Sequence, residues 1–161
     1  MFIRKANTGD ISGLIALLLQ VGKVHHDLRP DIFRPVTQKY DEAALTELLK
    51  DEKRPVFVAI DGDFVAGYCF CVLREYQNSG TVVDHKDLYI DDLCVDENRR
   101  GQGIATTLYR HAVSYARELG CKFVSLNVWC GNDNALRFYE KMGMRPRSMK
   151  METPLEETYA D

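Results

Sequence analysis

The residues from Asp91 to Leu108 have the types and spacing best suited to chemistry: Asp-Asp-Leu-Cys-Val-Asp-Glu-Asn-Arg-Arg-Gly-Gln-Gly-Ile-Ala-Thr-Thr-Leu. An apolar strand ends at Val95, a polar turn follows, and Gly101 and Gly103 lead directly into an amphipathic helix. Glycine has no Cβ, so the backbone can approach a ligand closely. The first helical turn has unpaired N–H groups that bind anions with the help of the helix dipole. The segment therefore predicts a site for a phosphate or a pyrophosphate, next to two arginines.

The common nucleotide-binding motifs fit this segment poorly. The sequence has no Gly-x-x-x-x-Gly-Lys-Ser/Thr loop, and Thr106 stands where a Gly-x-Gly-x-x-Gly motif needs its third glycine. Taken alone, the pattern also fits an ordinary turn between a strand and a helix, with its arginines in water. The choice between a phosphate site and such a turn depends on the rest of the chain.

Two motifs resemble those of one family. Arg100-Gly-Gln-Gly-Ile-Ala105 resembles the [QR]-x-x-G-x-[GA] acetyl-CoA signature of the GNAT superfamily of N-acetyltransferases. Asn132-Asp-Asn-Ala135 and Phe138-Tyr-Glu-Lys-Met-Gly143-Met resemble the family's second motif, an Asn-x-x-Ala helix that closes with Tyr-Glu-Lys-x-Gly-Phe. Met144 replaces the usual aromatic residue. One strand separates the motifs, as in the family, and the resemblance covers about residues 1–152.

Hydrophobic periodicity and turn residues predict the order βααβββαβα, with a last β region after it. The expected strands are 2–5, 56–60, 64–73, 88–95 and 123–128, and the expected helices are one capped by Thr8, then 41–49, 103–119 and 133–141. An Asp-Gly turn at 61–63 predicts a hairpin. Residues 25–35 are expected to be irregular, and residues 144–154 are expected to hold two short strands interrupted at Pro146.

The fold class is α/β: one GNAT-like domain over residues 1–161, frayed after about residue 155. The resemblance implies a mixed, mostly antiparallel twisted sheet with helices on both faces and a central parallel pair that is splayed at a β-bulge. Leu88 and Ile90 share one phase of the fourth strand, whereas Leu93 and Val95 share the other. The slip predicts an extra residue at Asp91-Asp92, unless both faces of this strand are buried.

The resemblance also implies which residues bind acetyl-CoA as the co-substrate. The backbone of Leu93, Cys94 and Val95 would hold the pantetheine arm and polarise the thioester carbonyl. The amides of Arg100, Gly101, Gln102, Gly103, Ile104 and Ala105 would bind the pyrophosphate, with the Arg100 side chain close by. Asn132 would bind cofactor, although Asn132 or Asp133 could instead cap the helix that follows.

Catalytic roles follow from the same resemblance. Tyr139 matches the tyrosine that protonates the leaving thiolate, and a phenol with a pKa of about 10 suits that task; a tyrosine packed in the core is the alternative. Tyr89-Ile-Asp-Asp-Leu93 resembles a stretch of diamine acetyltransferases whose acidic residue at the Asp91 position faces the substrate amine. Asp91 is therefore the expected base, with Asp92 or a water as alternatives. His25-His26 could bind substrate or lie in a solvated loop.

Composition limits the partners. The 161 residues carry a net charge of −3, which gives no general attraction to nucleic acid or anionic lipid. No apolar run approaches the roughly 20 residues of a membrane span, so we expect a cytoplasmic protein without membrane or nucleic-acid partners. The five cysteines form no CxxC pair and no zinc-type spacing with histidine. We expect buried thiols and no metal.

The expected function is therefore enzymatic: transfer of acetyl from acetyl-CoA to a small-molecule or peptide amine by direct attack in a ternary complex. The alternatives are a protein or peptide N-terminal acetyltransferase, a catalytically idle acyl-CoA-binding module, and a nucleotide-binding protein of another kind. A strand containing Met149 and Met151 could pair with a second subunit to form a homodimer, or it could complete its own sheet.

Overall fold

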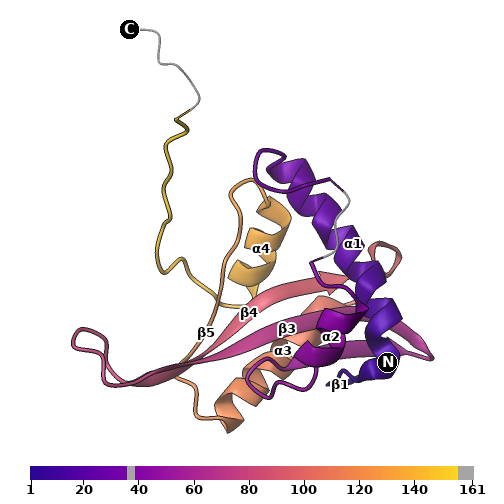
Figure 1. The fold of residues 1–161 in the computed structure, drawn as a ribbon, viewed down its shortest axis with the longest axis horizontal. Coiled ribbons are helices and arrows are strands. Elements are labelled where there is room, and N and C mark those ends of the chain that lie inside the picture. The colour runs from indigo at the N-terminus through magenta and orange to yellow at the C-terminus, as the bar shows by residue number, and fades with distance from the viewer. Residues whose placement is uncertain (36–38, 156–161) are drawn as a thin grey trace, which may run out of the picture.

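A computed structural model describes residues 1–35 and 39–155, which build one five-stranded sheet with helices on both faces (Figure 1). The strands lie in the order β1-β2-β3-β4-β5, and only the β4–β5 pair is parallel. Their bounds are β1 Phe2–Lys5, β2 Val56–Asp61, β3 Phe64–Tyr76, β4 His85–Val95 and β5 Phe123–Leu126. The predicted hairpin is β2–β3, and the predicted mixed sheet is confirmed.

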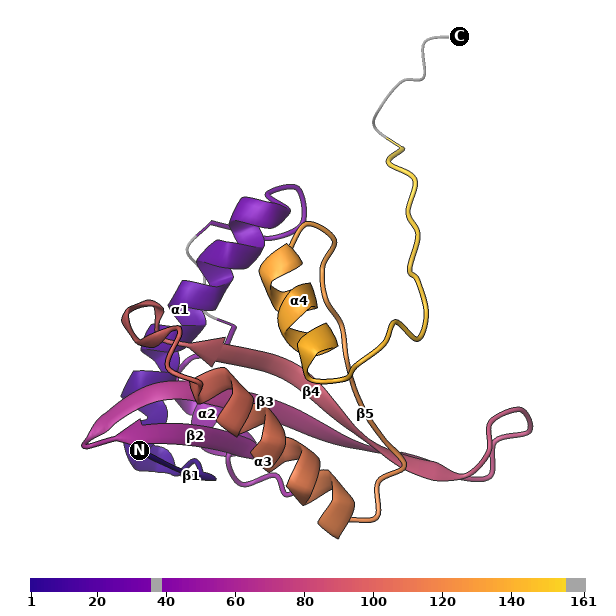
Figure 2. The ribbon, with the colours of Figure 1, turned by 180° about the vertical axis from the view of Figure 1, so that it is seen from behind.

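The helices divide the core into two clusters. On one face, α1 (Ile11–Leu28) and α2 (Glu42–Leu48) pack on β2, β3 and β4 through buried leucines and Tyr68. On the other face, α3 (Ile104–Glu118) buries Ile104 and Leu108 against the sheet, as Figure 2 shows from behind. The short helix α4 (Asp133–Lys141) adds Phe138 and Tyr139 to this second cluster, but none of its own residues is fully buried.

The predicted β-bulge lies where the sequence pattern slips. β3 pairs Phe70 with Asp92 and Cys71 with Ile90, so Asp91 is the extra residue of β4. The bulge keeps the apolar side chains of β4 on the α3 side, because Leu93 and Val95 join the same cluster as the residues before the bulge. It also turns Asp92 and Cys94 toward α1, where Cys94 belongs to the other cluster.

The first helix differs from the prediction at both ends. Asn7, not Thr8, provides the cap: its side chain accepts the Gly9 N–H, and a short 3-10 turn (Thr8–Asp10) precedes α1. Residues 25–28 were expected to be irregular, but they form the last turn of α1. Proline disfavours the helical conformation only in the residue directly before it. The helix therefore continues to Leu28 and ends at Arg29, which precedes Pro30.

The predicted strands at 144–154 are wrong. Residues 145–155 form no strand; they leave the body of the molecule as an extended segment, seen in yellow in Figures 1 and 2. A strand needs a hydrogen-bonding partner, and within the described residues β5 pairs with β4 alone. The fraying expected after residue 155 lies outside the described residues.

Candidate active site

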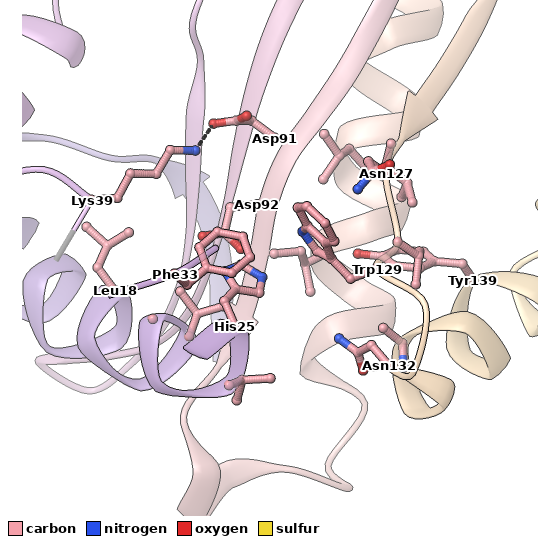
Figure 3. A pocket seen from close by; sticks show the side chains of 18 of the residues that line it. Leu18, His25, Phe33, Lys39, Asp91, Asp92, Asn127, Trp129, Asn132 and Tyr139 are labelled. Carbon is pink, nitrogen blue, oxygen red and sulfur yellow. Dashed lines mark hydrogen bonds and ion pairs between the residues drawn. The ribbon is translucent and has the colours of Figure 1, made fainter. Parts of the chain in front are cut away.

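A cavity of about 490 Å³ opens where β4 and β5 separate. Their parallel pairing ends at Ile90 and Leu126, whereas β4 continues beside β3 as far as Val95. Strand residues alternate in the direction of their backbone groups. The backbone groups of 91–95 that face β5 therefore have no strand partner within 1–35 and 39–155. The walls of this central cavity come from α1, β4, the residues after β5, and α4 (Figure 3).

The two adjacent acids of β4 have different surroundings. Asp91 lines the central cavity and forms an ion pair with Lys39. Asp92 also lines this cavity, and one of its oxygens accepts a hydrogen bond of 2.9 Å from the hydroxyl of the fully buried Tyr68. No cation is paired with Asp92 among the described residues. Desolvation raises the pKa of the Asp92 carboxyl above its ordinary value, which makes it a stronger base.

Tyr139 reaches the central cavity from α4, on the wall opposite α1, as Figure 3 shows. Its ring lies 6.2 Å from the Tyr109 ring and 5.0 Å from the Phe138 ring. Burial raises the pKa of Tyr139 far above the ordinary phenol value, so the hydroxyl stays protonated. Asn132 caps α4, because its side chain accepts the Ala135 N–H at 3.2 Å, and it also lines the cavity.

The glycine-rich loop begins directly after β4 and a short turn (Glu97–Arg99). Gly101 and Gly103 have φ of +77° and +78°, and a Cβ on either would meet no atom within 4 Å. Glycine is favoured here by the left-handed backbone, and the space where a Cβ would stand is open. Gly103 accepts the first helical bond of α3, from the Thr107 N–H, so the N–H groups of residues 104–106 have no helical acceptor.

The loop does not line the central cavity, and most of it is exposed. Ile104 is the buried residue of the loop and packs in the core. Arg100 turns back toward β4, with its Nε 3.5 Å from the Val95 carbonyl oxygen. Gln102 is exposed and Ala105 is half-buried. The structure thus brings Leu93, Asn132 and the three candidate catalytic residues (Asp91, Asp92 and Tyr139) to one cavity, and the predicted phosphate loop lies outside the lining of that cavity.

The Cys94 thiol does not line the central cavity. Its side chain is buried toward α1, with Sγ 3.7 Å from the Leu17 carbonyl oxygen. Burial raises the pKa of this thiol to about 12. A thiol of that pKa is protonated at neutral pH and unreactive.

Sequence reasoning missed an aromatic wall of the central cavity. His25 stacks on Phe33 with ring centroids 5.0 Å apart, and Phe33 meets the edge of Trp129 at 5.2 Å. His26 lies beside this wall, with Nδ1 2.7 Å from the Phe33 carbonyl oxygen. These residues come from α1 and from two distant loops, so no local pattern joins them. Trp129, the single tryptophan, directly follows a predicted strand and could have indicated a residue of the site. No feature of the sequence indicated that Lys39 belongs to the site.

Residues 22–144 match the family model described as Acetyltransferase (GNAT) family. The chain belongs to this family. A crystal structure of a mutant of the BH1408 protein from Bacillus halodurans is 33% identical, with a TM-score of 0.92 over 96% of this chain and 99% of that one. Mouse thialysine N-epsilon-acetyltransferase is 25% identical over 87% of this chain and 79% of its own length.

N-alpha-acetyltransferase 30 of Schizosaccharomyces pombe is 32% identical over 54% of this chain and 55% of its own length. The chain spans less than two thirds of the length of the first curated relatives that it matches. Membership confirms the predicted superfamily and fold, and it supports acetyltransferase activity with acetyl-CoA as the co-substrate that the family implies.

None of the described helices is both long and apolar enough to cross a membrane. Across 1–35 and 39–155, no three His, Cys, Asp or Glu side chains gather in a way that could hold a metal ion.

Proposed function

We propose that this chain is an N-acetyltransferase that moves an acetyl group from acetyl-CoA to a primary amine. One observation carries the proposal: the Asp92 carboxylate, which has no paired cation in the described part of the chain, and the protonated phenol of Tyr139 line the same cavity between splayed strands. Amine acetylation needs one group that removes a proton from the amine and another that protonates the leaving sulfur. The cavity has both, on different walls.

The residues present fit acetyl-CoA. The pyrophosphate would bind the N–H groups of Gly101 to Ala105, because the three N–H groups after Gly103 have no helical acceptor. The backbone of Leu93, Cys94 and Val95 borders the opening between β4 and β5 and would hold the pantetheine arm. Asn132 already caps α4 through its side-chain oxygen, and its side-chain NH2 group would donate a hydrogen bond to the cofactor.

Within this arrangement each group has one task. Bound acetyl-CoA supplies an electrophilic thioester carbonyl and a thiolate leaving group. Asp92 accepts a proton from the ammonium form of the acceptor, which frees the nitrogen lone pair to form the new bond to the carbonyl carbon. The second proton of the nitrogen leaves to solvent as the amide forms. Tyr139 donates its hydroxyl proton to the sulfur as the carbon–sulfur bond breaks. Backbone N–H groups of β4 beyond the bulge stabilise charge on the carbonyl oxygen.

This assignment changes the expected base. The resemblance to diamine acetyltransferases favoured Asp91, but Asp91 forms an ion pair with Lys39 that occupies one of its oxygens. No residue that the structure describes forms an ion pair with Asp92, and desolvation raises the pKa of Asp92. We therefore place Asp92 as the base and Asp91 as the residue that fixes Lys39 at the rim of the cavity.

The test compares Asp92→Asn with Asp91→Asn in an assay that detects the thiol released from acetyl-CoA over a panel of amines. Loss of a general base lowers kcat by about 10²-fold or more. We expect that loss for Asp92→Asn, with unchanged affinity for acetyl-CoA, and a much smaller effect for Asp91→Asn. The reverse ranking would restore Asp91 as the base, and no thiol release with any amine would support an idle binding module.

The second candidate acceptor is the N-terminal amine of a protein or peptide. It is favoured by the relatives named as N-alpha-acetyltransferases. The mouse relative is instead named for the side-chain amine of thialysine. Including peptides with free N-termini beside small diamines and thialysine in the panel distinguishes these acceptors.

A further inference from the structure

The α1 side of the central cavity is the side open to an acceptor amine. Tyr139 and Asn132 lie on the α4 side, which the proposed function assigns to acetyl-CoA. The α1 side carries Leu18 and Phe33, and Trp129 lies between the two sides, as Figure 3 shows. The cavity of about 490 Å³ has to hold the thioester end of the cofactor as well as the acceptor. The space that remains therefore suits a small acceptor.

The charges of the central cavity favour an acceptor with a single ammonium group. In the described residues, its lining contains two carboxylates, Asp91 and Asp92, and two permanent cations, Arg34 and Lys39. Lys39 already forms an ion pair with Asp91. Of the carboxylates that line the cavity within 1–35 and 39–155, only Asp92 remains to attract an ammonium group. A second ammonium group on the same molecule would meet Lys39 and Arg34 instead of a carboxylate.

The aromatic wall gives the acceptor side a flat apolar surface. His25 stacks on Phe33 with ring centroids 5.0 Å apart, and the rings of Phe33 and Trp129 meet edge to face at 5.2 Å. Aromatic rings attract one another in offset-stacked and edge-to-face arrangements at such distances. A ring on the acceptor therefore gains contacts here that a flexible aliphatic chain does not.

Contacts from α1 and the residues that follow it hold the aromatic wall in place. His26 Nδ1 lies 2.7 Å from the Phe33 carbonyl oxygen. The Arg29 guanidinium lies 6.0 Å from the centre of the Trp129 ring, within the range of a cation–π contact, and its Nε donates a hydrogen bond of 2.9 Å to Asp31. A surface that is already ordered loses little conformational entropy when a ligand binds. The wall is thus formed before the acceptor arrives.

We propose that the acceptor is a small monoamine whose other end is an aromatic ring, with its nitrogen at Asp92 and its ring against Phe33 and Trp129. This inference rests on the proposed function and names the acceptor class of that site. The acetyl transfer is unchanged: the nitrogen–carbon bond forms and the carbon–sulfur bond breaks. Asp92 takes one proton of the ammonium group, the second leaves to solvent, and Tyr139 protonates the sulfur.

The first test compares phenylethylamine, butylamine and putrescine as acceptors in thiol release from acetyl-CoA by the full chain. We expect kcat/KM for phenylethylamine to exceed that for butylamine by about tenfold or more, because the ring adds a buried apolar group and aromatic contacts. Putrescine, which carries a second ammonium group, should be the poorest of the three.

The outcomes of this test separate the acceptor class from the proposed function. An equal or higher kcat/KM for butylamine, for putrescine or for a peptide with a free N-terminus would overturn the aromatic acceptor and leave the acetyl transfer standing. No thiol release with any amine would instead overturn the proposed function, and the acceptor class with it.

Variants of the aromatic wall test its role in specificity. Trp129→Leu and Phe33→Leu keep an apolar side chain but remove the flat ring. Each should lower kcat/KM for phenylethylamine by about fivefold and that for butylamine by less than about twofold. Phe123→Leu is the matched control, because Phe123 is 42% exposed and does not line the central cavity. Equal losses for both amines in the wall variants would overturn the inference.

Lys39→Met tests the preference for a single ammonium group. The substitution removes the cation that is paired with Asp91, so a second ammonium group gains a carboxylate. We expect kcat/KM for putrescine to rise by about threefold relative to that for phenylethylamine, the effect of one partly exposed ion pair. An unchanged ratio would overturn the claim that the ion pair excludes diamines.

Binding can also be measured without turnover, because Trp129 is the single tryptophan of the chain. Its fluorescence therefore reports on the aromatic wall. With coenzyme A present, phenylethylamine should shift the emission to shorter wavelength as its ring displaces water from the indole, and putrescine at the same concentration should not. A shift without thiol release would support the ring site and refute acetyl transfer. No shift in a chain that acetylates other amines would refute the aromatic acceptor.

Discussion

Replacement of Tyr139 by phenylalanine removes one hydroxyl from the site and little else. No hydrogen bond is made by this hydroxyl among the described residues, and the ring keeps its contacts with Tyr109 and Phe138. We therefore expect no change in melting temperature. Binding of acetyl-CoA should also be unchanged within about twofold, because the proton transfer is needed only in the transition state.

The expected kinetic loss is at the lower end of the range for a general acid. Such groups contribute about 10²–10⁴-fold, and a thiolate is a good enough leaving group to depart partly without help. We expect Tyr139→Phe to lower kcat by about 10²-fold, which corresponds to about 2.7 kcal/mol of transition-state stabilisation. Burial raises the pKa of Tyr139, so the parent enzyme should not lose activity through this group up to about pH 9.

The assay is thiol release at saturating acetyl-CoA, with cofactor affinity measured separately by calorimetry. Tyr109→Phe is the matched control, because Tyr109 is a neighbouring buried tyrosine that does not line the central cavity. It should retain near-parent kcat. Equal loss of kcat and cofactor affinity in Tyr139→Phe, or no loss of either, would refute its role as the acid.

Three further predictions concern backbone strain and pH. Gly103 and Gly62 have φ of +78° and +63°, so Gly103→Ala and Gly62→Ala should each lower the free energy of unfolding in urea by about 1 kcal/mol. Only Gly103→Ala should weaken acetyl-CoA binding in calorimetry. Equal affinities of the two variants for acetyl-CoA would argue against the phosphate loop. Hydrogen bonds from Arg4 hold the pKa of Asp10 below its ordinary value. Asp10→Asn should therefore be less stable than the parent above about pH 4, and this difference should vanish as pH falls through the lowered pKa. A difference in stability that persists in strong acid contradicts this. Desolvation raises the pKa of Asp92, so the stability that its carboxyl contributes is fully present below about pH 4 and is lost as the carboxyl ionises at higher pH. Asp92→Asn should therefore have a higher melting temperature than the parent at about pH 7 but not at about pH 4. A lower melting temperature than the parent at about pH 7 would contradict this prediction.

Features set by local pattern were predictable from the sequence. The phase slip between Ile90 and Leu93 located the bulge, because a strand buried on one face must shift phase when a residue is inserted. The glycine loop was also predictable, since left-handed backbone favours glycine. The helix and strand order followed from periodicity up to Lys141.

Features set by contacts between distant segments were not predictable. Two adjacent acids in the sequence could not show that Lys39 would form an ion pair with Asp91 rather than with Asp92. The aromatic wall joins α1 to the loop after β5, which no spacing reveals. Residues 145–155 have the pattern of a strand, but whether a strand forms depends on a partner edge, and local sequence does not specify that edge.

The most direct test of the proposed cofactor site is a crystal structure of the full chain bound to coenzyme A. We predict that the diphosphate lies within hydrogen-bonding distance of the amide nitrogens between Gly101 and Ala105. The sulfur should lie in the central cavity near the Tyr139 hydroxyl. A diphosphate bound at any other place, or a sulfur directed away from Tyr139, would contradict the central claim.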